Sequence, residues 1–211
     1  MSPLGPFRLT ERLVDGTEAW IWRVEHVHSG MPAILRAYQP RPDRKPIDWY
    51  FRLVSTWRPL ALLDHPNLLG IFDYGLVSED DSRALGGQLK SGCSWFVEED
   101  APGGNLAQHP PDNWIECRQA LESVLRGLMH LHGHNLLHGS IRPDQIRRGS
   151  EAHPHLKLGG FAIGPEHRLR VLDGVLPGLV SDFAAPELQA GDWREVRAST
   201  DLYGVGALAH W

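Results

Sequence analysis

The sequence is poor in the features that mark secreted and membrane-spanning proteins. It has two cysteines among 211 residues, Cys93 and Cys117, and no Cys-x-x-Cys spacing, so we expect a reducing, cytoplasmic compartment. No apolar run approaches the ~20 residues that span a bilayer. The first residues carry neither a basic run nor an apolar core, so we expect no signal peptide.

Neither sign of charge is in large excess. The formal net charge of −5 argues against nucleic acid or an anionic membrane as the partner. Twelve histidines are present, but His130, His132 and His134 lie two residues apart, which is poor spacing for shared metal ligation on one helix. We therefore expect no metal site.

What the sequence does contain is strand patterns followed by helix patterns. Apolar residues at three-to-four spacing predict a buried helix over 113–133, and another helix is expected at 46–63, kinked or split at Pro59. A polar, glycine-rich loop is expected at 78–88. Apolar and charged residues alternate as in strands in five segments: 7–14, 19–27, 32–38, 68–77 and 94–99.

Six segments each match a motif of one protein family, in that family's order. They are H-P-N-I-V at 65–69, the interlobe hinge at 95–106, the catalytic loop H-R-D-L-K-P-x-N at 136–146, the strand leading into D-F-G at 156–162, A-P-E at 185–187 and a helix start at 198–206. Together they resemble eukaryotic-type Ser/Thr protein kinases over nearly all of residues 7–211.

The resemblance implies an α+β, protein-kinase-like two-lobed fold. We expect an N-lobe with an antiparallel five-stranded sheet and the hinge in residues 1–101. A mainly helical C-lobe should occupy residues 102–211. Because the helix that begins near Ala198 reaches only to Trp211, we expect this C-lobe to be incomplete.

Five positions that carry catalysis in the family are changed here. The aspartate that accepts the substrate proton is Ser140, and the two metal-binding positions are Gln145 and Gly160. The strand lysine is Arg36, and its helix glutamate is Thr56. A serine hydroxyl is not a base at neutral pH, and both metal ligands are lost. The resemblance therefore implies a degenerate member, a pseudokinase that is not an enzyme and holds no cofactor.

The nucleotide pocket is changed as well. Gly16 alone survives from the family's glycine-rich loop, and Ile34 replaces the small alanine beside adenine. Arg147 replaces the apolar floor of the pocket, and Glu98 stands at its back. We therefore expect no tight binding of Mg-ATP. Glu98 and Arg147 could pair and fill the site, or each could point into solvent.

The residues that stabilise the family's fold are retained. His138 and Phe161 match two residues that stack through the centre of the domain, and Leu60 could extend that stack. Asp201 matches the buried aspartate that caps the catalytic-loop backbone. The fold's frame is thus expected without its chemistry.

The segment from Ala162 to Phe183 has one hydroxyl residue, Ser181, and the arginine that would sense a phosphate is Gly139. A phosphorylation switch of the usual type is therefore not expected. The segment is instead apolar, so it either docks on a partner or folds back into the unused cleft. Its apolar residues are Leu169, Val171, Leu172, Val175, Leu176, Leu179 and Val180.

These observations favour a non-catalytic pseudokinase domain that acts as a protein-interaction scaffold or allosteric regulator. Its partner would be another protein, the remainder of a longer chain or a second copy. One alternative is a weakly active or rerouted Ser/Thr kinase-like nucleotide transferase. Another is a sensor that holds a small anion with Arg36 and Arg147.

Overall fold

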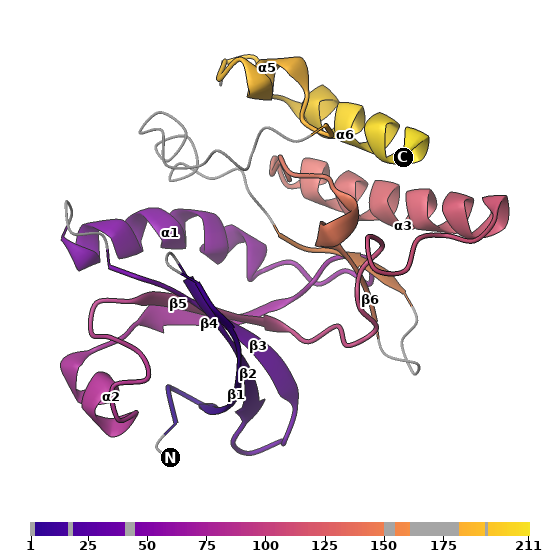
Figure 1. The fold of residues 1–211 in the computed structure, drawn as a ribbon. Coiled ribbons are helices and arrows are strands. Elements are labelled where there is room, and N and C mark those ends of the chain that lie inside the picture. The colour runs from indigo at the N-terminus through magenta and orange to yellow at the C-terminus, as the bar shows by residue number, and fades with distance from the viewer. Residues whose placement is uncertain (1–2, 17–18, 41–44, 150–154, 161–181, 193) are drawn as a thin grey trace. The chain divides into compact units, whose positions relative to one another are not determined.

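The computed structural model forms two compact units (Figure 1). The first contains residues 1–63 and 70–100, and the second contains residues 64–69 and 101–211. The structure describes all of the chain except residues 1–2, 17–18, 41–44, 150–154, 161–181 and 193.

The first unit is built on an antiparallel sheet of five strands in the order β1-β2-β3-β5-β4. Alternation along β3 places Ala33, Leu35 and Ala37 on one face, where each is completely buried. The α+β fold with a five-stranded antiparallel N-lobe sheet is thereby confirmed. The strands are β1 Phe7–Asp15, β2 Ala19–His26, β3 Pro32–Tyr38, β4 Ile71–Leu76 and β5 Ser94–Glu99.

Helix α1, Pro46–Leu60, packs against β4 and β5. Trp57 is the main contact, with its ring centroid 4.9 Å from that of Phe96 and 6.0 Å from that of Tyr38. Pro59, where a kink or a split was predicted, lies in the last turn of α1, and the helix ends one residue later. A proline there ends a helix, since it cannot donate an N–H to the preceding turn.

Helix α2, Glu79–Ala84, occupies part of the segment expected to be a loop. Ser78 caps it: its Oγ accepts from the Asp81 N–H at 3.0 Å, and Asp81 Oδ2 accepts from the Ser78 N–H at 3.0 Å. This reciprocal pair satisfies two backbone donors at the helix start. The prediction of a loop is therefore wrong for residues 79–84. The Ser-x-x-Asp pattern at 78–81 is the sequence signal that indicates this helix.

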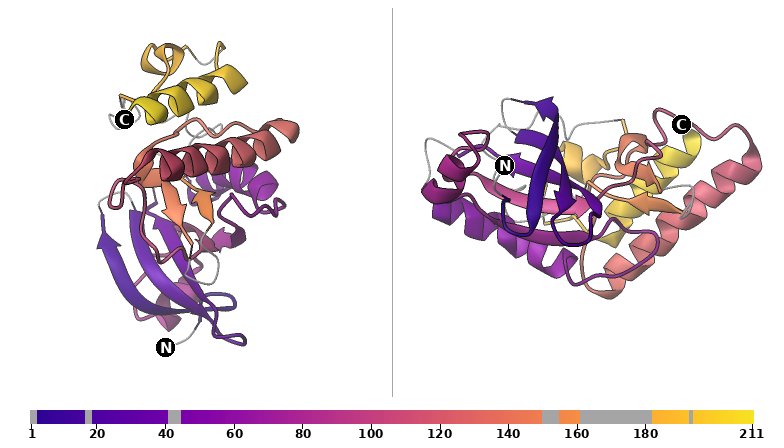
Figure 2. Two further views of the ribbon diagram at one scale, coloured as in Figure 1. Left: turned by 90° about the vertical axis from the view of Figure 1, so that its right-hand side faces the viewer. Right: turned by 90° about the horizontal axis from the view of Figure 1, so that it is seen from below.

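The second unit is built around α3, Trp114–Gly133, which contacts β7 and α6. Its buried residues Ala120, Val124, Leu128 and Leu131 follow the predicted helical spacing, and Figure 2 shows α6 running beside it. No helix in the described part of the chain is long and apolar enough to cross a membrane. The other elements are the 3₁₀ helix η1 Pro143–Gln145, β6 Ile146–Arg148, β7 Leu156–Leu158, α5 Pro186–Gln189 and α6 Ala198–His210.

Candidate functional site

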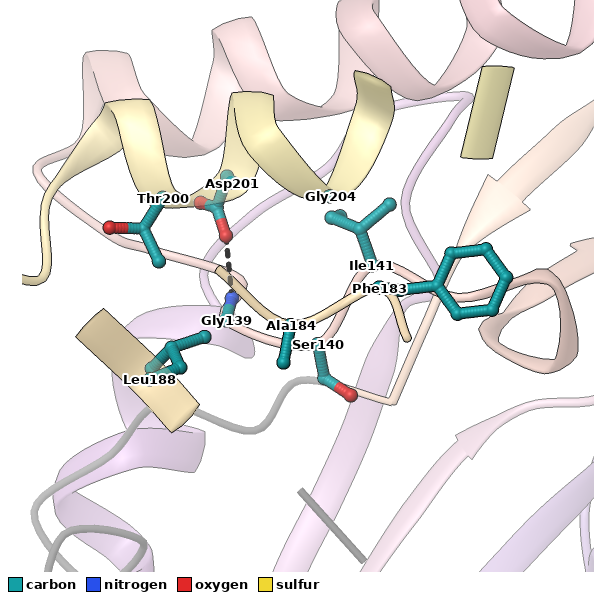
Figure 3. A pocket seen from close by; sticks show the side chains of 9 residues that line it. All are labelled: Gly139, Ser140, Ile141, Phe183, Ala184, Leu188, Thr200, Asp201 and Gly204. Carbon is teal, nitrogen blue, oxygen red and sulfur yellow. Dashed lines mark hydrogen bonds between the residues drawn. The ribbon is translucent and has the colours of Figure 1, made fainter. Parts of the chain in front are cut away.

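The loop that begins at His138 is anchored from α6 by Asp201. This carboxylate is 1% exposed and accepts hydrogen bonds from the backbone N–H of His138 at 2.9 Å and of Gly139 at 2.6 Å; the second is drawn in Figure 3. His132 Nε2 lies 2.8 Å from the same carboxylate. A buried carboxylate with three partners holds the loop backbone in one shape, as the sequence predicts for Asp201.

His138 fixes the loop from inside the unit. Its Nε2 lies 2.8 Å from the Gly159 carbonyl oxygen, so this nitrogen carries the proton, and its Nδ1 accepts from the Ser140 N–H at 3.1 Å. Burial lowers the pKa of His138, so the ring is held neutral. The loop and the end of β7 are therefore tied together. Phe161, the expected stacking partner, lies outside the described residues.

Ser140 follows Gly139 on this loop. Figure 3 shows its side chain pointing away from Asp201. The adjacent cavity has a volume of about 10 Å³, about the smallest that can hold one water molecule. Its lining residues are Gly139, Ser140, Ile141, Phe183, Ala184, Leu188, Thr200, Asp201 and Gly204.

Gln145 and Gly160, at the two expected metal positions, lie against each other. A Cβ added at Gly160 would overlap Gln145 Oε1, and Gly160 has φ +67°. Gln145 Nε2 donates to Asp144 Oδ2 at 2.7 Å, and Arg142 donates to both oxygens of Asp144 at 3.0 and 2.9 Å. The amide thus fills the space where a side chain at position 160 would begin.

These residues do not fit the magnesium ion that the family implies. Mg²⁺ takes oxygen ligands and prefers carboxylates, whereas the Asp144 carboxylate already accepts from Arg142 and Gln145. In the described part of the chain, no three His, Cys, Asp or Glu side chains are grouped so that they could hold a metal. Sequence reasoning missed Asp144 as the centre of this cluster, although Arg142-Pro143-Asp144-Gln145 places a cation and an amide around it.

In the first unit, Arg36 is paired with Glu98 on the neighbouring strand. Arg36 Nε donates to Glu98 Oε1 at 2.6 Å, and Glu98 is 5% exposed. The charge of Glu98 raises the pKa of Arg36, which is thus cationic at all relevant pH. Within its own sheet, Glu98 thus has Arg36 as a partner.

The remaining predicted residues are placed as follows. Gly16 lies at the β1–β2 turn, where a Cβ would come within 2.7 Å of the Ala19 carbonyl oxygen, so the turn itself requires glycine. Ile34 lies opposite Glu98 across the β3–β5 pair. Thr56 is in α1, and its side chain is not among the described parts of the structure. The apolar residues at 169–180 also lie outside the described residues.

Comparison with known proteins places these features in context. No protein-family model matches the chain. It is 30% identical over 156 residues to the serine/threonine-protein kinase GRIK1 of Arabidopsis thaliana, which covers 72% of this chain and 36% of GRIK1. It is 25% identical over 215 residues to the DNA damage-responsive serine/threonine-protein kinase RqkA of Deinococcus radiodurans, covering 98% of this chain and 29% of RqkA.

The serine/threonine-protein kinase ATG1a of Arabidopsis thaliana is 23% identical over 216 residues, covering 97% of this chain and 31% of ATG1a. The chain thus spans about a third of the length of these relatives. Their names correct one expectation: we expected the chain not to be an enzyme, and relatives that are named kinases point to an enzyme. The expectation failed because Ser140, Gln145 and Gly160 show which groups are missing, not what else could support a reaction.

The five strands pair as expected, and Asp201 holds the loop that carries the family's motif. The chain belongs to the protein kinase family.

Proposed function

We propose that the chain is a serine/threonine-kinase-like nucleotide transferase in which phosphoryl transfer is weak or rerouted. The observation that carries the proposal is the anchored loop. Asp201 and His138, both buried, hold residues 138–140 by four hydrogen bonds. A loop held in one shape can position a substrate, and positioning is a main protein contribution to phosphoryl transfer. The names of the relatives support the same reaction class.

The weakness of the reaction follows from Ser140. A neutral hydroxyl can donate or accept a hydrogen bond and so orient a substrate hydroxyl, but it cannot take its proton as a carboxylate does. General-base catalysis contributes roughly 10²–10⁴-fold. We therefore expect turnover to be lower by about this factor than in a kinase that has the aspartate. No part of the reaction is assigned to a bound metal, because Gln145 and Asp144 do not fit one.

The charge that remains for a phosphate is that of Arg36. Its guanidinium is cationic and fixed on β3 by Glu98, and arginine binds phosphate oxygens through two parallel N–H groups. Arg36 can thus bind and orient a phosphate. Without a base or a metal, the charge of Arg36 stabilises the bound nucleotide more than it stabilises the transition state.

The proposal is tested by incubating the protein with γ-labelled ATP and a generic protein substrate, with magnesium, with manganese and with EDTA. We expect slow transfer that Arg36→Ala abolishes, and the label should be on serine or threonine. Arg23→Ala, at a half-buried arginine of the neighbouring strand β2, is the matched control and should retain transfer. Transfer no faster in the wild type than in Arg36→Ala would overturn the proposal.

A second candidate function is a scaffold or allosteric role toward another protein, the remainder of a longer chain or a second copy. It is favoured by the contact between Gln145 and Gly160, where an uncharged side chain fills a metal position. The proposed docking segment is the apolar run at 169–180, on the basis of its sequence. Leu176→Asp and Leu179→Asp should abolish capture of a partner or self-association in sedimentation, whereas Arg36→Ala should not. A monomer with no partner, unchanged by the leucine variants, would contradict this role.

A further inference from the structure

The ion pair between Arg36 and Glu98 is formed wholly within the sheet. In the register of β3 and β5, Ile34 lies opposite Glu98 and Arg36 lies opposite Phe96. Arg36 and Glu98 are therefore diagonal neighbours on one face, close enough for long side chains to meet. Their relative side-chain exposures are 23% and 7%, so the pair is shielded from competing water.

The geometry uses only one edge of the guanidinium. Nε is the atom that donates to Glu98, and among the described residues this is the hydrogen bond that the structure gives the Arg36 side chain. The guanidinium is planar and rigid, so fixing Nε also fixes the two terminal nitrogens. These nitrogens form the fork that binds a carboxylate or phosphate through two parallel bonds.

The surroundings keep the pair in place. Tyr38 and Phe96 stack with centroids 6.3 Å apart on the same face, and Trp57 of α1 lies against Phe96. An aromatic wall lowers the local dielectric, so removal of either charge would leave the other poorly compensated. The one α1 residue at the family's glutamate position is Thr56, which has no charge.

We propose that Glu98 is a positioning residue that holds Arg36 from β5, in place of a carboxylate on α1, and thereby sets the affinity of Arg36 for a nucleotide's phosphates. The consequence is that the phosphate-binding cation is fixed by the sheet itself. Its placement does not depend on the orientation of α1. This inference rests on the proposed function, because it assigns a ligand to the same site.

The test measures binding and not turnover, so that it can be separated from the proposed function. ATP and inorganic pyrophosphate are titrated calorimetrically, without divalent metal, into the wild type, Glu98→Gln, Arg36→Ala and the double variant. We expect Glu98→Gln to weaken binding of both ligands about tenfold, because it removes a charge-assisted bond. Arg36→Ala should weaken it at least as much, and the double variant should add nothing further, since both changes disable the same group.

The matched control is Glu11→Gln. Glu11 also pairs with an arginine of a neighbouring strand, Arg23, at 2.5 Å, but the two side chains are 58% and 43% exposed, far more than the Arg36–Glu98 pair. It should leave the affinity unchanged. Glu98→Asp keeps the charge on a shorter side chain, so it should bind both ligands more tightly than Glu98→Gln. This second variant keeps the test valid if Glu98→Gln fails to fold.

Wild-type affinity in Glu98→Gln, or tighter binding there, would overturn the positioning role, because Glu98 would then merely compete with the phosphate. Absence of binding of either ligand to the wild type would overturn it as well. Normal binding that depends on Glu98, together with no phosphoryl transfer, would support the inference and sink only the proposed function.

Discussion

The frame of the loop at 138–146 and its reactive positions differ in how they are held. The frame consists of His138 and Asp201, both buried and hydrogen-bonded to backbone groups. Of the reactive positions, Ser140 and Gly160 lack the carboxylates of the family's motif, and Gln145 carries its amide on a side chain that is one carbon longer. The frame needs two buried side chains that bind backbone groups, whereas the chemistry needs carboxylates at other positions. A fold can therefore keep the first while the second changes.

The largest expected effect comes from breaking the frame. Asp201→Ala would leave the N–H groups of His138 and Gly139 buried without their acceptor, and we expect it to lower the free energy of unfolding by about 3–5 kcal/mol. Urea denaturation followed by fluorescence measures this. The exposed Asp192→Ala should change it by less than about 0.5 kcal/mol. A loss below about 1 kcal/mol in Asp201→Ala would show that the frame does not depend on this carboxylate.

A smaller effect is expected from restoring a reactive position. Gly160→Asp would put a side chain on a residue with left-handed backbone conformation and press its Cβ against Gln145 Oε1. We therefore expect the free energy of unfolding to fall by about 1–3 kcal/mol. Gly191→Asp is the matched control: φ is +70°, and no described residue lies within 4 Å of an added Cβ. Gly191→Asp introduces the same backbone strain without a clash against a neighbouring side chain, so it should lower the free energy of unfolding by less.

The double variant Gly160→Asp with Gln145→Asn sharpens this comparison. The shorter amide vacates the space, so the pair should be more stable than the sum of the two single changes, by about 0.5 kcal/mol or more. Strict additivity in urea denaturation would mean that the two positions are independent.

The sequence predicted much of the fold because the strands are half-buried, which produces alternation that can be read directly. It missed α2 because a six-residue polar helix has no apolar stripe, and only Ser78 and Asp81 indicate it. In the site, the frame was predictable from the motif that contains His138. The partner of Glu98 was not, because it depends on the register of β3 and β5, which makes Arg36 the diagonal neighbour of Glu98.

The contact of Gln145 with Gly160 was equally hidden from the sequence. Gln145 ends η1 and Gly160 follows β7, and their contact depends on the positive φ of Gly160 and the hydrogen bond of Gln145 to Asp144. Sequence comparison treats them as two separate losses. In the folded chain they form one packed arrangement.

The smallest effect concerns acid. Burial lowers the pKa of His138, and burial together with His130 and Lys157 lowers the pKa of His65, whose ring stacks 4.8 Å from that of His130. A histidine whose pKa is lowered on folding binds protons more readily when unfolded. Its contribution to stability is therefore present above the unfolded pKa of about 6.5 and is lost as the pH falls below it.

His65→Gln should remove one of these two contributions. We expect the fall in the free energy of unfolding between pH 7.5 and pH 5.5 to become smaller, but not to vanish, because His138 remains buried in the frame. Asp64 lies beside His65 and acts in the opposite direction, which keeps the effect modest. Urea denaturation at both pH values measures it. An unchanged fall would place the acid sensitivity in the frame alone, and a larger fall would contradict the sign of the His65 shift.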